Sequence, residues 1–165
     1  MRVYLVRHGV AASGGYDLDE HRPLTEEGRR RFRASAAVWT EQGASPTRWL
    51  VSPLVRAVQT AEIALAAFGA EGPVEIRGEL VPEGRISAAA QLVDDHFGET
   101  LAIVGPQPMI GALAAFLLGL GSVPAGVEPG AILALDLPEG GDDRGPRIAW
   151  HLRPGEPPRL LVPPG

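Results

Sequence analysis

The sequence predicts an α/β fold of three layers, in which helices cover both faces of a mainly parallel central sheet with an antiparallel edge. Short runs of apolar and β-branched residues alternate along the chain with segments of helical periodicity, in the order β-α-β-α-β-α-β-α-β-β. Such alternation is typical of parallel sheets, because each crossover between parallel strands needs a connection of helical length. The last two strands are separated only by a turn-rich stretch, residues 138–143, so we expect them to pair in antiparallel fashion.

The first strand is the apolar run Val3-Tyr4-Leu5-Val6, which is rich in residues that favour strands. It ends abruptly at Arg7-His8-Gly9, and the polar, glycine-bearing residues 9–23 are expected to form a long loop. Thr25 is the predicted N-cap of the first helix, whose first turn is acidic. The expected apolar face of this helix consists of Gly28, Phe32, Ala36 and Trp39. On its exposed side, the expected ion pairs are Glu26–Arg30 and Glu27–Arg31.

The remaining elements follow from the same two periodicities. Pro53 is expected at the first helical position of the second helix, where its missing N–H needs no partner. The strand at residues 74–77 is expected to be a weak one. The further predicted strands are residues 48–52, 74–77, 100–105, 131–137 and 147–153, and the further predicted helices are residues 54–68, 86–97 and 109–120.

Length and composition limit the class of protein. A chain of 165 residues that is 45% hydrophobic can bury one continuous core. We expect residues 1–153 to form a single domain and the Pro-rich residues 154–165 to form an extended or frayed tail. The formal net charge of −5 argues against nucleic acid and anionic membrane surfaces as partners. Cysteine is absent, which excludes disulfides, thiol catalysis and Cys-ligated metals.

The apolar runs of the chain do not predict a targeting signal or a membrane-spanning segment. The N-terminal run is too short for a signal peptide before charge returns. Residues 101–123 are the most apolar segment, but proline and glycine interrupt them, and a membrane span needs roughly 20 apolar residues. We therefore expect a cytoplasmic protein.

Three segments lie where a predicted strand ends and a helix begins: Arg7-His8-Gly9, Ser52 to Arg56, and Gly105-Pro106. The carboxyl ends of parallel strands share one edge of a sheet, and ligands bind in the crevice beyond them. We expect the three segments to form one pocket. The guanidinium groups of its two arginines, together with the backbone N–H groups at the start of the second helix, suit a phosphoryl group.

His8 is the candidate nucleophile of this pocket. Neutral imidazole is abundant at pH 7, and a phosphorus–nitrogen bond is labile enough for water to cleave it in a second step. Positioning and charge neutralisation would supply most of the rate. Taken alone, His8 could equally be a structural histidine at a strand end, and it is the segment Ser52 to Ala61 that favours catalysis.

Three segments resemble motifs of the histidine phosphatase superfamily: Leu-Val-Arg-His-Gly at residues 5–9, Arg-Pro-Leu-Thr-Glu-Glu-Gly at residues 22–28, and Val-Ser-Pro-Leu-Val-Arg-Ala-Val-Gln-Thr-Ala at residues 51–61. The Arg-His-Gly motif is weak by itself, but its combination with the third segment at this separation is specific. The resemblance runs from Met1 to about Leu120 and more faintly through the final strands. It implies a phosphoglycerate mutase-like fold, and the short chain, without an inserted helical subdomain, resembles the SixA-type phosphohistidine phosphatase branch.

The resemblance also implies roles for individual residues. His8 would carry the phosphoryl group as an intermediate, Arg7 and Arg56 would bind phosphate, and Arg22 would be a further contact near the pocket mouth. Ser52, ahead of the second helix, is a further candidate phosphate ligand. No cofactor is expected, and the histidines and carboxylates show no metal-ligand spacing.

Pro106 departs from the family pattern, which places a second histidine here in a Gly-His-x-Pro or Ser-His-x-Pro context. This chain reads Val-Gly-Pro-Gln-Pro at residues 104–108, and proline has neither a side-chain donor nor a backbone N–H. Removing a comparable preorganised donor costs roughly 10²–10³ in rate in other enzymes. His21 is the candidate stand-in, whereas His96 and His151 are expected to be structural or exposed to solvent.

Glu79 and Glu83, in the loop after the third strand, are the candidate proton donors for the leaving group. Glu79 better matches the family's Glu-Leu-x-Pro stretch. Both could equally be solvated loop carboxylates. If the substrate is phosphohistidine, its imidazole leaves readily, so that a strong general acid matters less.

Two functions remain open. The leading hypothesis is a phosphatase that hydrolyses phosphohistidine on a protein, or a small phosphorylated metabolite, through an intermediate on His8. The other is a phosphate-binding pseudoenzyme with weak or no turnover, because Pro106 replaces the second histidine. A nucleotide-binding domain is disfavoured, since the chain has no Gly-rich phosphate loop and no dinucleotide fingerprint.

Overall fold

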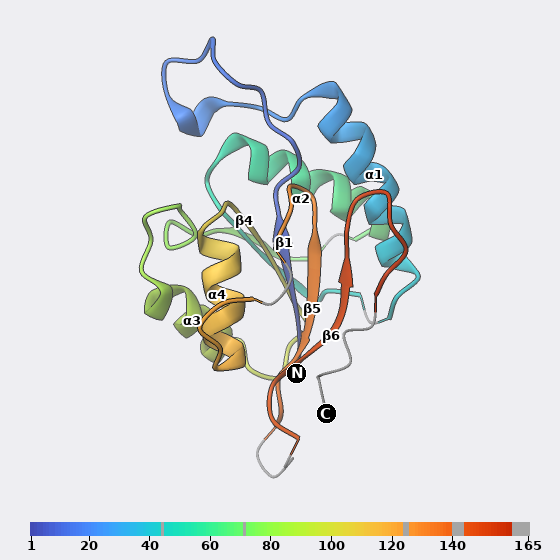
Figure 1. The fold of residues 1–165 in the computed structure, drawn as a ribbon, viewed down its shortest axis with the longest axis vertical. Coiled ribbons are helices and arrows are strands. Elements are labelled where there is room, and N and C mark those ends of the chain that lie inside the picture. Colours follow the sequence, from blue (N-terminus) through green and yellow to red (C-terminus); the bar gives the residue numbers. More distant parts are fainter. Residues whose placement is uncertain (44, 71, 124–125, 140–143, 160–165) are drawn as a thin grey trace.

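The computed structural model describes residues 1–43, 45–70, 72–123, 126–139 and 144–159 of the chain. Within these residues, six strands form one sheet in the order β3-β2-β4-β1-β5-β6 (Figure 1). The strands are β1 (Arg2–Arg7), β2 (Arg48–Val51), β3 (Val74–Ile76), β4 (Leu101–Gly105), β5 (Ile132–Asp136) and β6 (Arg147–Leu152).

The register of the sheet confirms the predicted mixture of directions. Strand β1 pairs in parallel with β4, and β2 pairs in parallel with both β4 and β3. Strand β5 is antiparallel to β1 on one side and to β6 on the other. Arg7 at the end of β1 lies opposite Gly105 at the end of β4, so both strands reach the same edge of the sheet.

Helices cover both faces of the sheet, as the alternating pattern predicts. Helices α1 (Glu26–Thr40) and α2 (Val55–Phe68) lie on one face, and α3 (Ile86–Asp95) and α4 (Met109–Leu118) lie on the other (Figure 1). A short 3-10 helix, η1 (Asp19–His21), interrupts the loop that was expected to be irregular between β1 and α1.

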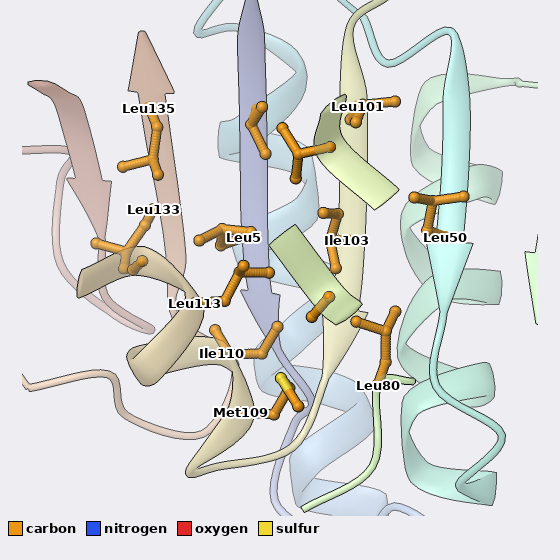
Figure 2. Packing of buried hydrophobic residues seen from close by; sticks show 14 of the residues in the cluster. Leu5, Leu50, Leu80, Leu101, Ile103, Met109, Ile110, Leu113, Leu133 and Leu135 are labelled. Atoms are coloured by element: carbon orange, nitrogen blue, oxygen red, sulfur yellow. The ribbon is translucent and has the colours of Figure 1, made fainter. Parts of the chain in front are cut away.

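Two hydrophobic cores result, one on each face. Along β1, Val3 and Leu5 face the core under α3 and α4, whereas Tyr4 and Val6 face the core under α1 and α2. This alternation is the two-residue period of a strand buried on both faces. Figure 2 shows the first of these cores, in which side chains from the sheet meet those of α4.

Helix α1 begins as the sequence predicts. The hydroxyl of Thr25 accepts a hydrogen bond of 2.9 Å from the N–H of Gly28, which caps the first turn. The four residues of the expected apolar face are all buried. The expected ion pair of Glu27 was wrong by one residue: its carboxylate contacts Arg30, three positions on, at 2.6 Å. Spacings of three and four residues both bring side chains together on a helix.

Helix α2 starts later than predicted. Leu54 is its N-cap, in an extended conformation with φ −63° and ψ 133°, and Val55 is the first helical residue. Pro53 therefore precedes the cap and does not occupy the first helical position. The backbone N–H of Leu54 points back to the hydroxyl of Ser52 at 3.4 Å, so the chain turns once more before the helix begins.

Helices α3 and α4 each end two residues before their predicted ends. The Nδ1 atom of His96, which follows α3, hydrogen bonds to the carbonyl oxygen of Leu92 at 2.7 Å. Gly119 follows α4 with φ +66°, a left-handed conformation that ends helices and suits glycine.

The chain returns to the sheet after β6. Arg159 pairs in antiparallel fashion with His151 through two backbone hydrogen bonds of 2.9 Å. Residues 140–143 of the expected turn at 138–143, and residues 160–165 of the expected tail, lie outside the described residues. In the part of the chain that the structure describes, no helix is both long and apolar enough to cross a membrane.

Candidate active site

The three predicted segments meet at the edge of the sheet where the parallel strands end. The backbone N–H of His8, just past β1, donates to the carbonyl oxygen of Gly105 at 3.0 Å. The N–H of Ser52, just past β2, donates to the carbonyl oxygen of Val104 at 2.9 Å. The loop between β1 and α1 extends beyond this same edge (Figure 1).

The hydrogen bonds of His8 define which ring nitrogen carries the proton. Its Nδ1 atom lies 2.7 Å from the carbonyl oxygen of Gly9, which can only accept, so Nδ1 is the protonated nitrogen. The Nε–H of Arg56 donates to the other ring nitrogen, Nε2, at 3.1 Å. Both contacts assign the same neutral tautomer, with the lone pair on Nε2. A lone pair held in this way can act as a nucleophile.

The surroundings of His8 keep its ring uncharged. The side chain is buried, and burial, followed by the positive charges of Arg56, Arg7 and Arg22, lowers the pKa of His8 to about 4, although the hydrogen bond to Gly9 opposes this shift. At neutral pH the imidazole is therefore almost wholly in its nucleophilic form. The nearby guanidinium groups favour a neutral ring as well as an anionic ligand.

Arg56 lies in the first turn of α2 and uses its three nitrogens in different directions. Nε binds His8, Nη1 donates to the main-chain oxygen of Asp19 at 2.7 Å, and Nη2 donates to the carboxylate of Asp19 at 2.8 Å. The side chain of Arg56 is almost fully buried. The structure thus brings Arg56 to His8, as the sequence predicts.

Asp19 is a site residue that the sequence analysis missed. Its carboxylate binds Arg56 through Oδ2 and Arg22 through Oδ1, the latter at 2.8 Å from Nε and 2.7 Å from Nη2. Hydrogen bonds from Arg56 and then from Arg22 lower the pKa of this carboxyl group. The only signal in the sequence is a carboxylate three positions before an arginine, which is too common to identify a site.

Arg22, expected near the mouth of the site, is close enough to His8 for its charge to lower the pKa of that ring. Besides Asp19, its Nη1 binds the carbonyl oxygen of Ala12 at 2.8 Å. The two ends of the loop are joined at this point. The N–H of Ala12 donates to the carbonyl oxygen of Pro23 at 2.8 Å, and Ala11 forms an isolated antiparallel β-bridge with Leu24. Arg22 is thus held on both sides by backbone and carboxylate acceptors.

Arg7 approaches the site from the end of β1. Its Nη1 donates to the carbonyl oxygen of Val127 at 2.8 Å, and its buried Nε has no hydrogen-bond partner among the described residues. Burial lowers the pKa of Arg7. Buried donors are nearly always satisfied in native proteins, so Arg7 has capacity for a further acceptor.

The third motif also supplies two residues that brace the site. Thr60 accepts a hydrogen bond of 3.1 Å from the N–H of Gly9 and donates one of 2.7 Å to the carbonyl oxygen of Arg56. Gln59 accepts one of 2.8 Å from the N–H of Leu24. These side chains join α2 to the segments around His8 and Thr25, which gives a physical reason for polar residues on that turn of the helix.

Two of the expected phosphate ligands are placed differently from the arginines. Ser52 is fully buried, and its hydroxyl accepts the N–H of Leu54 described above. His21 is largely exposed and lies 3.8 Å from the carboxylate of Glu20. Among the described residues, neither side chain forms a hydrogen bond with His8. His151 is buried in β6, and desolvation lowers its pKa, which agrees with a structural role.

Glu79 forms an ion pair with Arg77, at 2.9 Å between Oε1 and Nη2. This hydrogen bond is the largest of the influences that lower the pKa of Glu79. A carboxyl group that is ionised in this way holds no proton to donate at neutral pH. Glu83 is exposed in the turn that follows, and no hydrogen bond of its side chain is found among the described residues.

Pro106 lies directly after Gly105, whose carbonyl oxygen binds the N–H of His8. It is buried, and its own carbonyl oxygen accepts the N–H of Ile110 at 3.0 Å, in the first turn of α4. Position 106 is therefore next to His8 through the backbone, but proline brings no donor to it. Among the described residues, no group of three or more His, Asp or Glu side chains is arranged to hold a metal ion.

Comparison with known sequences relates the chain to one family. The model of the histidine phosphatase superfamily (branch 1) matches residues 3–81. The phosphohistidine phosphatase SixA of Escherichia coli (strain K12) is 31% identical over 157 residues, which cover 93% of this chain and 94% of that protein. An uncharacterized protein of a Picosynechococcus species is 36% identical over 118 residues, which cover 69% of this chain and 71% of that protein.

Comparison of structures gives the same relationship. The structure of the protein histidine phosphatase SixA complexed with tungstate matches this fold with a TM-score of 0.80 and 30% sequence identity. The match covers 93% of this chain and 97% of that one. The similarity therefore extends over the whole sheet and the helices on both of its faces.

Proposed function

The chain belongs to the histidine phosphatase superfamily, and from that premise we propose that it is a phosphatase that passes a phosphoryl group from its substrate to Nε2 of His8 and then to water. One observation carries this proposal. The ring of His8 is neutral, with its lone pair on Nε2, and the guanidinium groups of Arg7, Arg22 and Arg56 are close enough to lower its pKa. A nucleophile surrounded by fixed cations suits a phosphoryl group and little else.

In the first step Nε2 of His8 attacks the phosphorus atom. The new P–N bond forms as the bond to the leaving group breaks, and the leaving group departs with that electron pair and a proton taken from solvent. The Nε–H of Arg56, which binds Nε2 before substrate arrives, is free to turn to a phosphoryl oxygen once the lone pair is used. The carbonyl oxygen of Gly9 continues to hold Nδ1–H and stabilises the charge on the phosphorylated ring.

In the second step water attacks the phosphorus atom and the P–N bond breaks. The electron pair returns to Nε2, which restores the neutral tautomer, and inorganic phosphate leaves with both protons of the water, as dihydrogen phosphate. The arginines bind the same oxygens in both steps. Each step thus uses the same preorganised charges.

For the substrate we propose phosphohistidine on a protein, with a small phosphomonoester as the other class. The similarity to SixA supports the first. The ion pair between Glu79 and Arg77 also supports it, because an ionised carboxyl group is a poor proton donor. An alkyl phosphoester needs an acid to deliver a proton to its leaving oxygen, whereas the other ring nitrogen of phosphohistidine can take a proton from solvent, so that neutral imidazole leaves.

Pro106 is the observation that favours a second candidate, a phosphate-binding pseudoenzyme. Its position beside His8 brings no hydrogen-bond donor to a phosphoryl oxygen. Such a protein would bind a phosphorylated group through the same arginines and release it unchanged.

Hydrolysis assays of the purified chain distinguish the two candidates. A phosphohistidine-bearing protein and an alkyl phosphomonoester, glycerol 2-phosphate, serve as substrates, and Pro106→His is assayed beside the native chain. We expect the native chain to hydrolyse phosphohistidine, and Pro106→His to raise the rate more for the alkyl ester. If the native chain binds phosphate but hydrolyses neither substrate, the pseudoenzyme is correct.

A further inference from the structure

The carboxylate of Asp19 lies between the two arginines that approach the site from different segments of the chain. Its Oδ2 atom accepts Nη2 of Arg56 at 2.8 Å, and its Oδ1 atom accepts Nε of Arg22 at 2.8 Å. Its main-chain oxygen accepts Nη1 of Arg56 at 2.7 Å. Arg56 comes from α2 and Arg22 from the loop before α1, so Asp19 is what connects them.

The hydrogen bonds of Arg56 are divided between Asp19 and His8. A guanidinium group has five N–H donors, one on Nε and two on each terminal nitrogen. Asp19 takes one from each terminal nitrogen, while Nε is directed to His8. One N–H on each terminal nitrogen, and Nε itself when His8 reacts, are left for a ligand. Asp19 can therefore keep its hold on Arg56 while an oxyanion binds.

The segment that carries Asp19 is itself fixed. Asp19 opens the 3-10 helix η1, and its main-chain oxygen also accepts the N–H of Arg22 at 3.2 Å. The base of the loop is closed by the bridge between Ala11 and Leu24. Because the side chain of Asp19 is largely exposed, its charge adds little to folding stability by itself. Because both partners of this carboxylate, Arg22 and Arg56, lie close to His8, we expect Asp19 to act at the site.

We propose that Asp19 is a positioning residue, which holds the guanidinium groups of Arg22 and Arg56 where they bind the phosphoryl oxygens. The inference rests on the proposed phosphoryl site, and it adds a residue and a role to that site. Asp19 touches neither the substrate nor Nε2 of His8; it acts through the two arginines. Its negative charge also offsets the mutual repulsion of the cations around His8.

Substitution of Asp19 by Asn tests this role. The amide oxygen of Asn can accept a hydrogen bond from one guanidinium group. Its NH₂ group then faces the second guanidinium group, and because both are donors they cannot form a hydrogen bond. We expect Asp19→Asn to weaken the binding of tungstate, measured by titration calorimetry, about tenfold. Asp17→Asn, at an exposed carboxylate in the same loop, is the matched control, because the ion pairs of Arg22 and Arg56 within the described part of the chain are with Asp19; it should bind tungstate as the native chain does.

A double-mutant cycle shows whether Asp19 acts through Arg22. We expect Asp19→Asn to weaken tungstate binding less in an Arg22→Gln background than in the native chain, because one of its two partners is then gone. Equal effects in both backgrounds would contradict the inference. Thermal denaturation of each variant separates a loss of positioning from a loss of folding, and Asp19→Glu should recover part of the tungstate affinity.

The opposite result has a clear meaning. If the carboxylate competes with the anion for the arginines, Asp19→Asn will bind tungstate as tightly as the native chain or more tightly, and the positioning role is then wrong. Binding is measured without turnover, so a native chain that binds tungstate but hydrolyses nothing would refute the proposed function and leave the test of Asp19 intact.

Discussion

Arg56 donates its Nε–H to Nε2 of His8 across 3.1 Å, although 48 positions separate the two residues in the chain. The contact joins the end of β1 to the first turn of α2. It places a permanent cation against the one ring nitrogen that has a lone pair. After burial, the charge of Arg56 is one of the causes that lower the pKa of His8, and the proposed nucleophile is the nitrogen that Arg56 contacts.

The tautomer of His8 can be observed directly. We expect ¹⁵N NMR of the ring to show a proton on Nδ1 and none on Nε2 at pH 7, because Gly9 accepts from Nδ1 and Arg56 donates to Nε2. Burial and the nearby arginines lower the pKa of His8 to about 4, so the same spectrum should persist at pH 5.5. A titration midpoint close to the ordinary value of about 6.5 would contradict this environment.

The same shift makes stability depend on pH. The pKa of His8 is about 4 in the folded chain and about 6.5 in the unfolded chain, so the unfolded state binds more protons between these values. The free energy of unfolding should therefore rise with pH across this window. Between pH 4.5 and pH 7 the native chain should gain about 2 kcal/mol more than His8→Gln, measured by urea denaturation. Parallel pH profiles of the two proteins would show that His8 ionises normally.

Arg56 should be indispensable for binding an oxyanion. Arg56→Gln removes the guanidinium group that contacts both His8 and Asp19, and we expect kcat/KM to fall by roughly 10²–10³. Arg30→Gln is the matched control, because Arg30 is exposed on α1 and, among the described residues, its ion pair is with Glu27. Loss of activity in both variants alike would point to net charge as the cause, and no loss in Arg56→Gln would remove Arg56 from the site.

Thr60 should stabilise the segment around His8. Its hydroxyl is fully buried between the N–H of Gly9 and the carbonyl oxygen of Arg56. Thr60→Val keeps the shape but leaves the Gly9 N–H without its partner, which should cost about 1–3 kcal/mol in the free energy of unfolding. Thr60→Ser keeps the hydroxyl and should lose less. If Thr60→Val and Thr60→Ser lower the free energy of unfolding equally, Thr60 does not stabilise the fold through these hydrogen bonds.

The fold could be predicted from the sequence because its signals are local and repeated. Strands β1 and β4 are continuous apolar runs, as strands buried on both faces must be. Helix α1 has a capping threonine and an apolar face at helical spacing. The start of α2 and the ends of α3 and α4 were each misplaced by one or two residues, because a cap depends on backbone angles at a single position, such as Gly119.

The site was predictable only in part. His8 and Arg56 follow from strand ends that must share one edge of a parallel sheet. Asp19 could not be found in this way, because its place depends on how the loop before α1 folds over that edge. Glu79 was a candidate acid from its position, but the sequence did not reveal that Arg77 would pair with it across two residues. Long-range contacts of loop side chains carry no periodic signal.

The central claim is that Nε2 of His8 is the nucleophile, and hydrolysis of p-nitrophenyl phosphate by His8→Ala tests it most directly. The ring is removed while Arg7, Arg22 and Arg56 remain, so the anion site stays charged. We expect the native chain to hydrolyse the ester and His8→Ala to fall to the rate of the buffer blank, while both unfold cooperatively. Hydrolysis by His8→Ala at the native rate would contradict the claim.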